Sequence, residues 1–138
     1  MGRLALVIAL DTNVLVRYLV EDDEKQSALA AALIARVVAS DDALFVSDVV
    51  VCETVWVLSV SYDVARKEIA ALLRNLFRAR HLVFSAPERL IRALDAYEAG
   101  KGDFADYLIR EHALAADCEH VVTFDRVLLR ERGFAAVR

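Results

Sequence analysis

The feature that most constrains the fold is a continuous apolar run, Leu4–Leu10, which ends directly at Asp11. A short apolar run without polar alternation is typical of a strand that is buried on both faces of a parallel sheet. Similar runs recur along the chain and predict further strands at Ala43–Val46, His81–Phe84 and His120–Phe124, with a last edge strand at Phe134–Val137. The chain is therefore expected to build its sheet from short, largely buried strands.

Helical segments separate the expected strands. They are predicted at Thr12–Val20, Gln26–Ala39, Asp48–Val60, Val64–Phe77, Pro87–Ala99 and Asp103–Ala116. Ser47 or Asp48 can cap the third of these helices and Asp63 the fourth, while Pro87 suits a first helical turn. This alternation predicts an α/β protein with a short, mostly parallel central sheet of about four or five strands, covered by helices on both faces. Its 138 residues suit one domain over residues 1–138.

Composition and charge narrow the function. Hydrophobic residues make up 58% of the chain, above the usual value of about 45–50%, and apolar surface beyond the needs of a core usually serves a partner. A net charge of −4 argues against a general nucleic-acid coat but leaves room for a nuclease with local cations. The first residues contain no signal peptide, and their apolar run is too short to span a bilayer. We therefore expect a cytoplasmic protein.

Two aspartates directly follow expected strands: Asp11 ends the first run and Asp125 ends Val121–Phe124. Ligand sites in open parallel sheets form at the carboxyl ends of strands, so the two carboxylates are expected to share an acidic pocket. Helix capping is the alternative for each of them. Thr12 and Asn13, next to Asp11, can orient a water or a carboxylate by hydrogen bonds, or cap the first helical turn.

Glu53 lies in a helical segment, Val49–Leu58, that is apolar almost all round and is therefore expected to be buried. A buried glutamate costs several kcal/mol unless a cation accompanies it. A metal ion would remove that cost, and a salt bridge to Arg17 is the alternative.

Asp103 and Asp106 are spaced i, i+3 and share one face of their helix, although an acid in a first turn also suits the helix dipole.

Several carboxylates in one pocket would repel each other. Hard divalent cations such as Mg²⁺ prefer oxygen ligands and relieve that repulsion. Such an ion can also activate water and neutralise charge on a phosphodiester. The predicted metal ligands are Asp11, Glu53, Asp103, Asp106 and Asp125.

The motifs that carry these acids resemble the PIN domain. They are Asp11-Thr12-Asn13 after a strand, Glu53 three residues before Trp56, Asp103-Phe104-Ala105-Asp106, and Thr123-Phe124-Asp125 after a strand. The stretch Ile8–Asp23 is especially similar to the VapC toxins of toxin–antitoxin pairs. The resemblance extends over nearly the whole chain and implies a PIN-like three-layer fold.

The resemblance also implies an activity. It implies an endoribonuclease that depends on Mg²⁺ or Mn²⁺, usually dimeric, that cuts structured RNA such as tRNA or rRNA and is inhibited by a VapB-like antitoxin. By this similarity the core quartet is Asp11, Glu53, Asp106 and Asp125, with Asp103 as an accessory member. Thr12 or Thr123 would supply a supporting hydroxyl.

Substrate and partner surfaces are also expected. The cations nearest to the acids in sequence, and thus candidates for phosphate contacts, are Arg17, Lys101, Arg126 and Arg130. The basic residues Arg66, Lys67, Arg74, Arg78 and Arg80 are expected to form a solvated face. The apolar segments Val14–Leu19 and Leu29–Val38 are expected to form a dimer surface or an antitoxin groove.

Three other functions were weighed. A phosphatase of the haloacid dehalogenase type needs a second aspartate where this chain has Asn13, and a phosphoacceptor receiver domain needs a lysine that is missing. A non-catalytic PIN module that binds RNA or protein is the main alternative. The intact acidic set argues against it.

Overall fold

The computed structural model describes residues 6–138. Helices alternate with strands along the chain, in the order β1 (Val7–Ala9), α1 (Thr12–Leu19), α2 (Glu24–Ser40), β2 (Ala43–Phe45), α3 (Asp48–Val60), α4 (Arg66–Arg78), β3 (Leu82–Val83), α5 (Pro87–Ala99), α6 (Phe104–Ala115), β4 (Val121–Thr123), the 3₁₀ helix η1 (Leu128–Arg130) and β5 (Phe134–Ala136). This order confirms the predicted α/β class. The part of the first expected strand before residue 6 lies outside the described residues.

The strands lie in two sheets, whereas the sequence predicted one central sheet. Strands β1, β2 and β3 form a three-stranded sheet in that order, and β4 pairs with β5 in a second sheet. All three pairings are parallel, as expected; Val7 pairs with Ala43, Leu44 with Leu82 and Val121 with Phe134. Within residues 6–138 no strand pairing joins the two sheets.

Local signals place most helix boundaries. The Ser47 side chain accepts a hydrogen bond from the Val50 N–H and so caps α3, and Pro87 begins α5 as expected. The proposed cap at Asp63 is wrong. Asp63 has a left-handed backbone conformation (φ 53°), and α4 begins after Ala65 without a side-chain cap.

The core lies between the first sheet and the helices that pack around it. Leu44 and Val46 of the β2 region and Leu58, Leu73 and Leu94 of three helices are fully buried. Neighbouring helices pack in the pairs α1–α2, α1–α3, α4–α5 and α5–α6. No helix in the described part of the chain is both long and apolar enough to cross a membrane.

Strand β1 is not buried, which corrects the expectation for its apolar run. Val7 is 62% exposed and Ile8 44% exposed, and only Leu10 beyond the strand is buried. The physical reason is that β1 lies at the end of its sheet and pairs on one side only, with β2. Apolar composition indicated a strand but not its place in the sheet.

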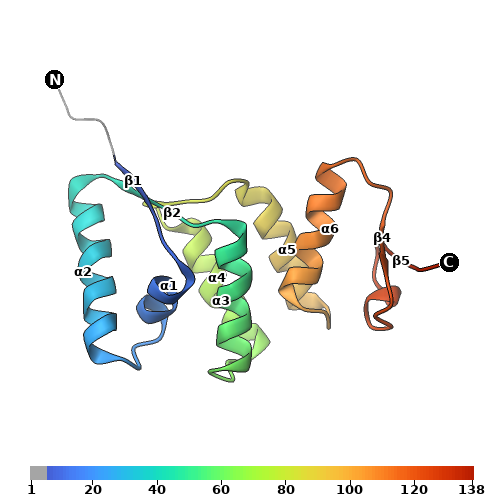
Figure 1. Cartoon of the computed structure of the whole chain (residues 1–138), viewed down its shortest axis with the longest axis horizontal. Coiled ribbons are helices and arrows are strands. Elements are labelled where there is room, and N and C mark those ends of the chain that lie inside the picture. Colours follow the sequence, from blue (N-terminus) through green and yellow to red (C-terminus); the bar gives the residue numbers. More distant parts are fainter. Residues whose placement is uncertain (1–5) are drawn as a thin grey trace.

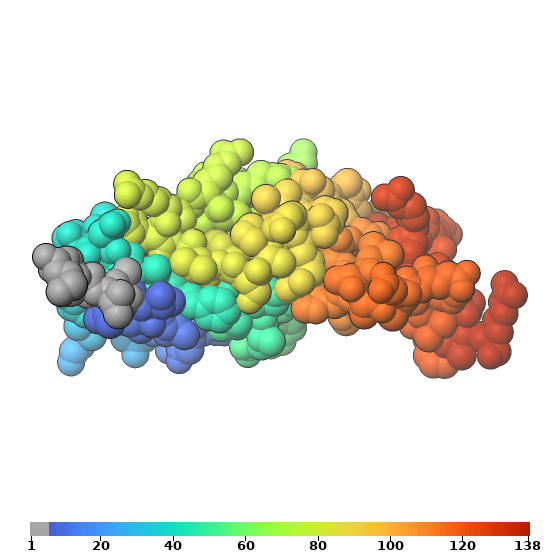
Figure 2. All heavy atoms as spheres, turned by 90° about the horizontal axis from the view of Figure 1, so that it is seen from above, coloured from blue at the N-terminus to red at the C-terminus, as the bar shows by residue number. Residues whose placement is uncertain are grey.

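The molecule is elongated (Figures 1 and 2). Helix α2 lies at one end, and the C-terminal pair β4–β5 lies at the other, beyond α6 (Figure 1). The view from above shows the same C-terminal segment protruding from the body (Figure 2). Strands β1 and β4 are thus separated by helices α3, α5 and α6 within one chain.

Candidate functional site

One group of the predicted site residues lies where β1 ends. The Asp11 carboxylate accepts a hydrogen bond from the Val14 N–H (3.0 Å) and caps α1. Thr12, the next residue, donates its hydroxyl to Glu53 Oε1 on α3 (3.0 Å). This contact joins residues 41 positions apart, and it fixes the orientation of the Glu53 carboxylate.

Glu53 itself is exposed, so the expectation that it is buried is wrong. Helix α3 packs through Val51, Thr54, Val55 and Leu58, while Val49, Trp56 and Val60 are more than 60% exposed. The sequence shows an apolar helix all round, but only one face of it meets the core. Glu53 therefore does not need a cation to offset burial.

A second group surrounds the first turn of α6. Asp106 Oδ2 accepts a hydrogen bond from the Asp103 N–H (3.0 Å). Burial raises the pKa of Asp106, the hydrogen bond from the Asp103 backbone lowers it, and the negative charges of Asp103, Asp125 and Glu131 raise it further. The charges of three carboxylates from α6 and the C-terminal segment therefore act on Asp106.

Asp125 follows β4 in a tight turn. Its N–H donates to Thr123 Oγ1 (3.0 Å), and its carboxylate accepts from the Val127 N–H (2.9 Å). The Thr123 hydroxyl therefore supports the backbone of Asp125. Asp11 thus shows the helix cap that was the alternative to ligation, whereas Asp125 forms a local turn and does not cap η1. Both keep one carboxylate oxygen without a hydrogen bond among the described residues.

One member of each group lies near the contact of α3 with α6. A hollow of about 360 Å³ is lined by Glu53 and Cys52 on α3 and by Ala105 and Ile109 on α6. A neighbouring hollow is lined by Cys52 and Asp103. We call these two hollows the α3–α6 groove; Asp11, Asp106 and Asp125 line neither of them.

The groove does not gather the full ligand set. Among residues 6–138 no three acidic, histidine or cysteine side chains converge closely enough to hold a metal ion. The donors are oxygen atoms of the type that Mg²⁺ prefers, but a single chain divides them into the group of Asp11 and Glu53 and the group of Asp103, Asp106 and Asp125. The oxygen donors of these residues suit a divalent cation. Within one chain, however, they do not converge on a single site that could bind it.

Asn13 makes no hydrogen bond to a predicted metal ligand within residues 6–138. It lines a hollow between α1 and α2, together with Val14, Leu29 and Leu33.

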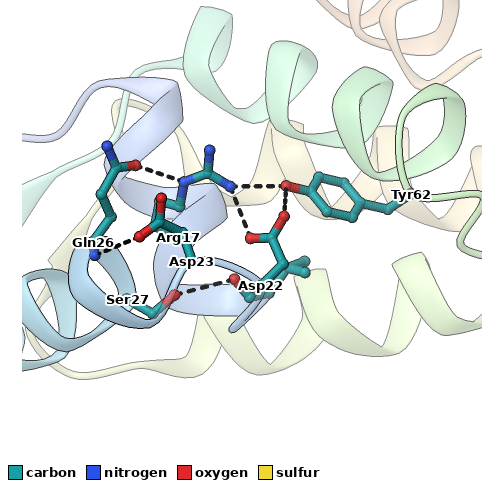
Figure 3. A network of polar contacts seen from close by, with 7 residues as sticks. Arg17, Asp22, Asp23, Gln26, Ser27 and Tyr62 are labelled. Carbon is teal, nitrogen blue, oxygen red and sulfur yellow. Dashed lines mark hydrogen bonds and ion pairs between the residues drawn. The ribbon is translucent and has the colours of Figure 1, made fainter.

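Arg17 is held in a polar network between α1, the start of α2 and the end of α3 (Figure 3). It donates to Asp22 (2.8 Å), Gln26 (2.7 Å) and the Tyr62 hydroxyl (2.9 Å), and Tyr62 donates to Asp22 (2.6 Å). Arg17 therefore does not pair with Glu53, which was the alternative to metal ligation.

The other expected cations divide into two kinds. Lys101, Arg126 and Arg130 line a hollow of about 480 Å³ together with Glu131, next to the second acidic group. Arg66 instead donates to the carbonyl oxygens of residues 97, 101 and 102 and lies over the Tyr97 ring. Only the first kind is placed to meet a phosphate backbone.

The sequence did not reveal the anchor that holds the C-terminal segment on α6. The fully buried Tyr107 donates its hydroxyl to the Glu131 carboxylate (2.6 Å) and accepts from the Gly102 N–H (2.9 Å). A Cβ on residue 102 would lie only 2.7 Å from Leu128 Cδ2. The two glycines of Gly100-Lys101-Gly102 are the one signal in the sequence for this close approach.

Short parallel sheets between helices, with acidic side chains after β1 and β4, define an α/β protein with its polar site at strand ends. A protein-family model for the PIN domain matches residues 8–134. The chain therefore belongs to the PIN domain family, whose members are generally metal-dependent nucleases. It matches no curated protein.

Proposed function

We propose that this protein is an endoribonuclease that hydrolyses RNA phosphodiester bonds with Mg²⁺ or Mn²⁺. The observation that carries the proposal is that Glu53 and Asp103 line the α3–α6 groove of a chain whose residues 8–134 match the PIN domain model. A divalent ion bound by such carboxylates supplies charge neutralisation at the phosphate and an activated water.

The chain's own residues prepare this site. The Thr12 hydroxyl orients Glu53, and the Asp103 N–H holds the Asp106 carboxylate in place. Lys101, Arg126 and Arg130 lie beside the second acidic group and contact the RNA backbone in our proposal. The carboxylates would bind metal ions, and the neighbouring cations would bind the phosphates of the RNA. Together these two kinds of side chain suit a polyanionic substrate.

We further propose that the enzyme is a VapC-type toxin that acts in the cytoplasm as a homodimer and is inhibited by a VapB-like antitoxin. An apolar surface on α1 and α2 supports a partner of this kind, since Leu29 is 64% exposed and Val38 50% exposed. Hollows of about 300 and 370 Å³ flank it, one between α1 and α2 and one between α1, α2 and α4. An amphipathic antitoxin helix fits such a groove.

The experiment is cleavage of total RNA by the purified chain with Mg²⁺, with Mn²⁺ or with a chelator. Asp11→Ala and Asp106→Asn are expected to abolish cutting, and Thr12→Val to slow it by about 10–100-fold, as for residues that orient metal ligands. The exposed Glu68 on α4 gives the matched control, Glu68→Gln, which should cut at the wild-type rate.

Cutting that survives Asp11→Ala and Asp106→Asn would refute the site, and RNA binding without cutting would establish the non-catalytic alternative. The toxin role is tested separately. Expression should arrest growth, a neighbouring reading frame should relieve the arrest, and sequencing of the RNA fragments should identify the cleavage site.

A further inference from the structure

Two strands of this chain present open edges. Strand β1 pairs only with β2, and β4 pairs only with β5, among residues 6–138. An open edge usually carries a lysine, a proline or a bulge that prevents pairing with another chain. Neither Val7–Ala9 nor Val121–Thr123 contains a charged residue or a proline, and Ile8 and Val122 are 44% and 59% exposed. Both edges are therefore competent to accept a strand.

The two edges correspond in register. Asp11 lies two residues beyond the end of β1, and Asp125 lies two residues beyond the end of β4. If β4 pairs with β1 in parallel, Val7 opposite Val121 and Ala9 opposite Thr123, then Asp11 lies opposite Asp125. Neighbouring strands are about 4.8 Å apart, so this pairing brings together the acidic groups that one chain keeps separate.

The β4 strand is held away from β1 of its own chain. The Tyr107 hydroxyl donates a hydrogen bond to Glu131, and Arg110 donates one to the Arg132 carbonyl oxygen (2.8 Å). Leu128 of η1 is buried, with 3% of its surface exposed. These contacts fasten the C-terminal segment to the far side of α6, at the opposite end of the molecule from α2 (Figure 1). A second copy can reach the open edge of β4 without breaking any of them.

We infer that β1 of one copy pairs in parallel with β4 of a second copy, which joins the two sheets and places Asp11 of one chain beside Asp125 of the other. Two copies related by a twofold axis make this junction twice and close as a dimer. The consequence for RNA cleavage rests on the proposed function, whereas the pairing itself does not.

The test is disulfide cross-linking in a chain that carries Cys52→Ser and Cys118→Ser. Ile8→Cys and Val122→Cys are introduced into separate chains, one of them lengthened by a tag so that the species differ in size. In register, the Cα atoms of residues 8 and 122 lie within the range of about 4.4–6.8 Å that a disulfide spans. Oxidised glutathione should join the mixed chains into a heterodimer and join either chain alone much less. A mixture of Ile8→Cys with Leu114→Cys, exposed on α6, is the control and should give no disulfide-linked product.

Two results of this experiment would overturn the inference. One is the absence of a mixed product. The other comes from a single chain that carries both Ile8→Cys and Val122→Cys. If this chain forms an internal disulfide as a monomer, β4 pairs with β1 of its own chain.

Sedimentation of the unmodified protein gives a second readout that needs no activity. A dimer is expected at micromolar concentration, and Val122→Lys should convert it to a monomer while the circular dichroism spectrum is unchanged. Val60→Lys, at a position 62% exposed on α3, should remain a dimer. A monomeric wild-type protein would refute the pairing, and an open polymer would refute the twofold closure. Loss of RNA cleavage with an intact dimer would count against the proposed function alone.

Discussion

Replacing Tyr107 by phenylalanine tests the anchor between α6 and the C-terminal segment. The ring is fully buried, and phenylalanine fills the same space, so only the hydroxyl is lost. That hydroxyl is hydrogen-bonded to Gly102, in the loop before α6, and to Glu131, which follows η1. Its removal therefore disconnects two segments without creating a large cavity.

The expected cost follows from the two hydrogen bonds. The Gly102 N–H bond is buried, and a buried donor left without a partner costs about 1–3 kcal/mol. Glu131 is half-buried and regains water, so the loss of its bond adds the ordinary net value of about 0.5–1.5 kcal/mol. We expect Tyr107→Phe to lower the free energy of unfolding by about 1.5–4.5 kcal/mol.

Urea unfolding followed by circular dichroism measures this loss. Tyr97→Phe is the matched control, because Tyr97 is buried and its hydroxyl makes no hydrogen bond within residues 6–138; we expect a change below about 0.5 kcal/mol there. Glu131→Gln completes a double-mutant cycle and should show coupling with Tyr107→Phe. If Tyr107→Phe and Tyr97→Phe cost the same, the hydroxyl is not the anchor.

Two further predictions concern ionisable groups. The Tyr62 hydroxyl and the Arg17 guanidinium hold the pKa of Asp22 below its usual value, so ionised Asp22 stabilises the fold above the pKa of the unfolded chain, and that stability is lost as pH falls through the lower folded pKa. Asp22→Asn should thus lower the melting temperature more at pH 7 than at pH 3, unlike Glu21→Gln; an equal loss at both values would contradict this. Burial, with the charges of Asp48 and Glu53, raises the pKa of the Cys52 thiol to about 11. At pH 8 a disulfide reagent should therefore label the exposed Cys118 quickly and Cys52 only on unfolding, and equal rates would refute the assignment.

Elements whose signals are local could be predicted from the sequence. Pro87 marks the start of α5, Ser47 caps α3, and the apolar runs locate β2, β3, β4 and β5 to within one residue. The acids after β1 and β4 were identified for the same reason, since their position follows from strand ends. The contact of Thr12 with Glu53 agrees with the supporting role predicted for a hydroxyl.

Properties set by distant neighbours could not be predicted. An apolar helix does not reveal which of its faces is covered, so Glu53 was expected to be buried and is exposed. An apolar strand does not reveal whether it has one neighbour or two, so β1 was placed inside a single sheet. The partners of Tyr107 and Arg17 lie 24 and 45 residues away in the chain, and no spacing rule connects them.

The separation of the two sheets has a consequence for local stability. No strand pairing within the described residues ties β4–β5 to the first sheet, so the C-terminal strands can open while Leu44 and its neighbours stay hydrogen-bonded. Backbone amides of Val121–Thr123 should then exchange with solvent hydrogen through a sub-global opening, at a lower free energy than the amides of β2, which exchange only when the whole domain unfolds.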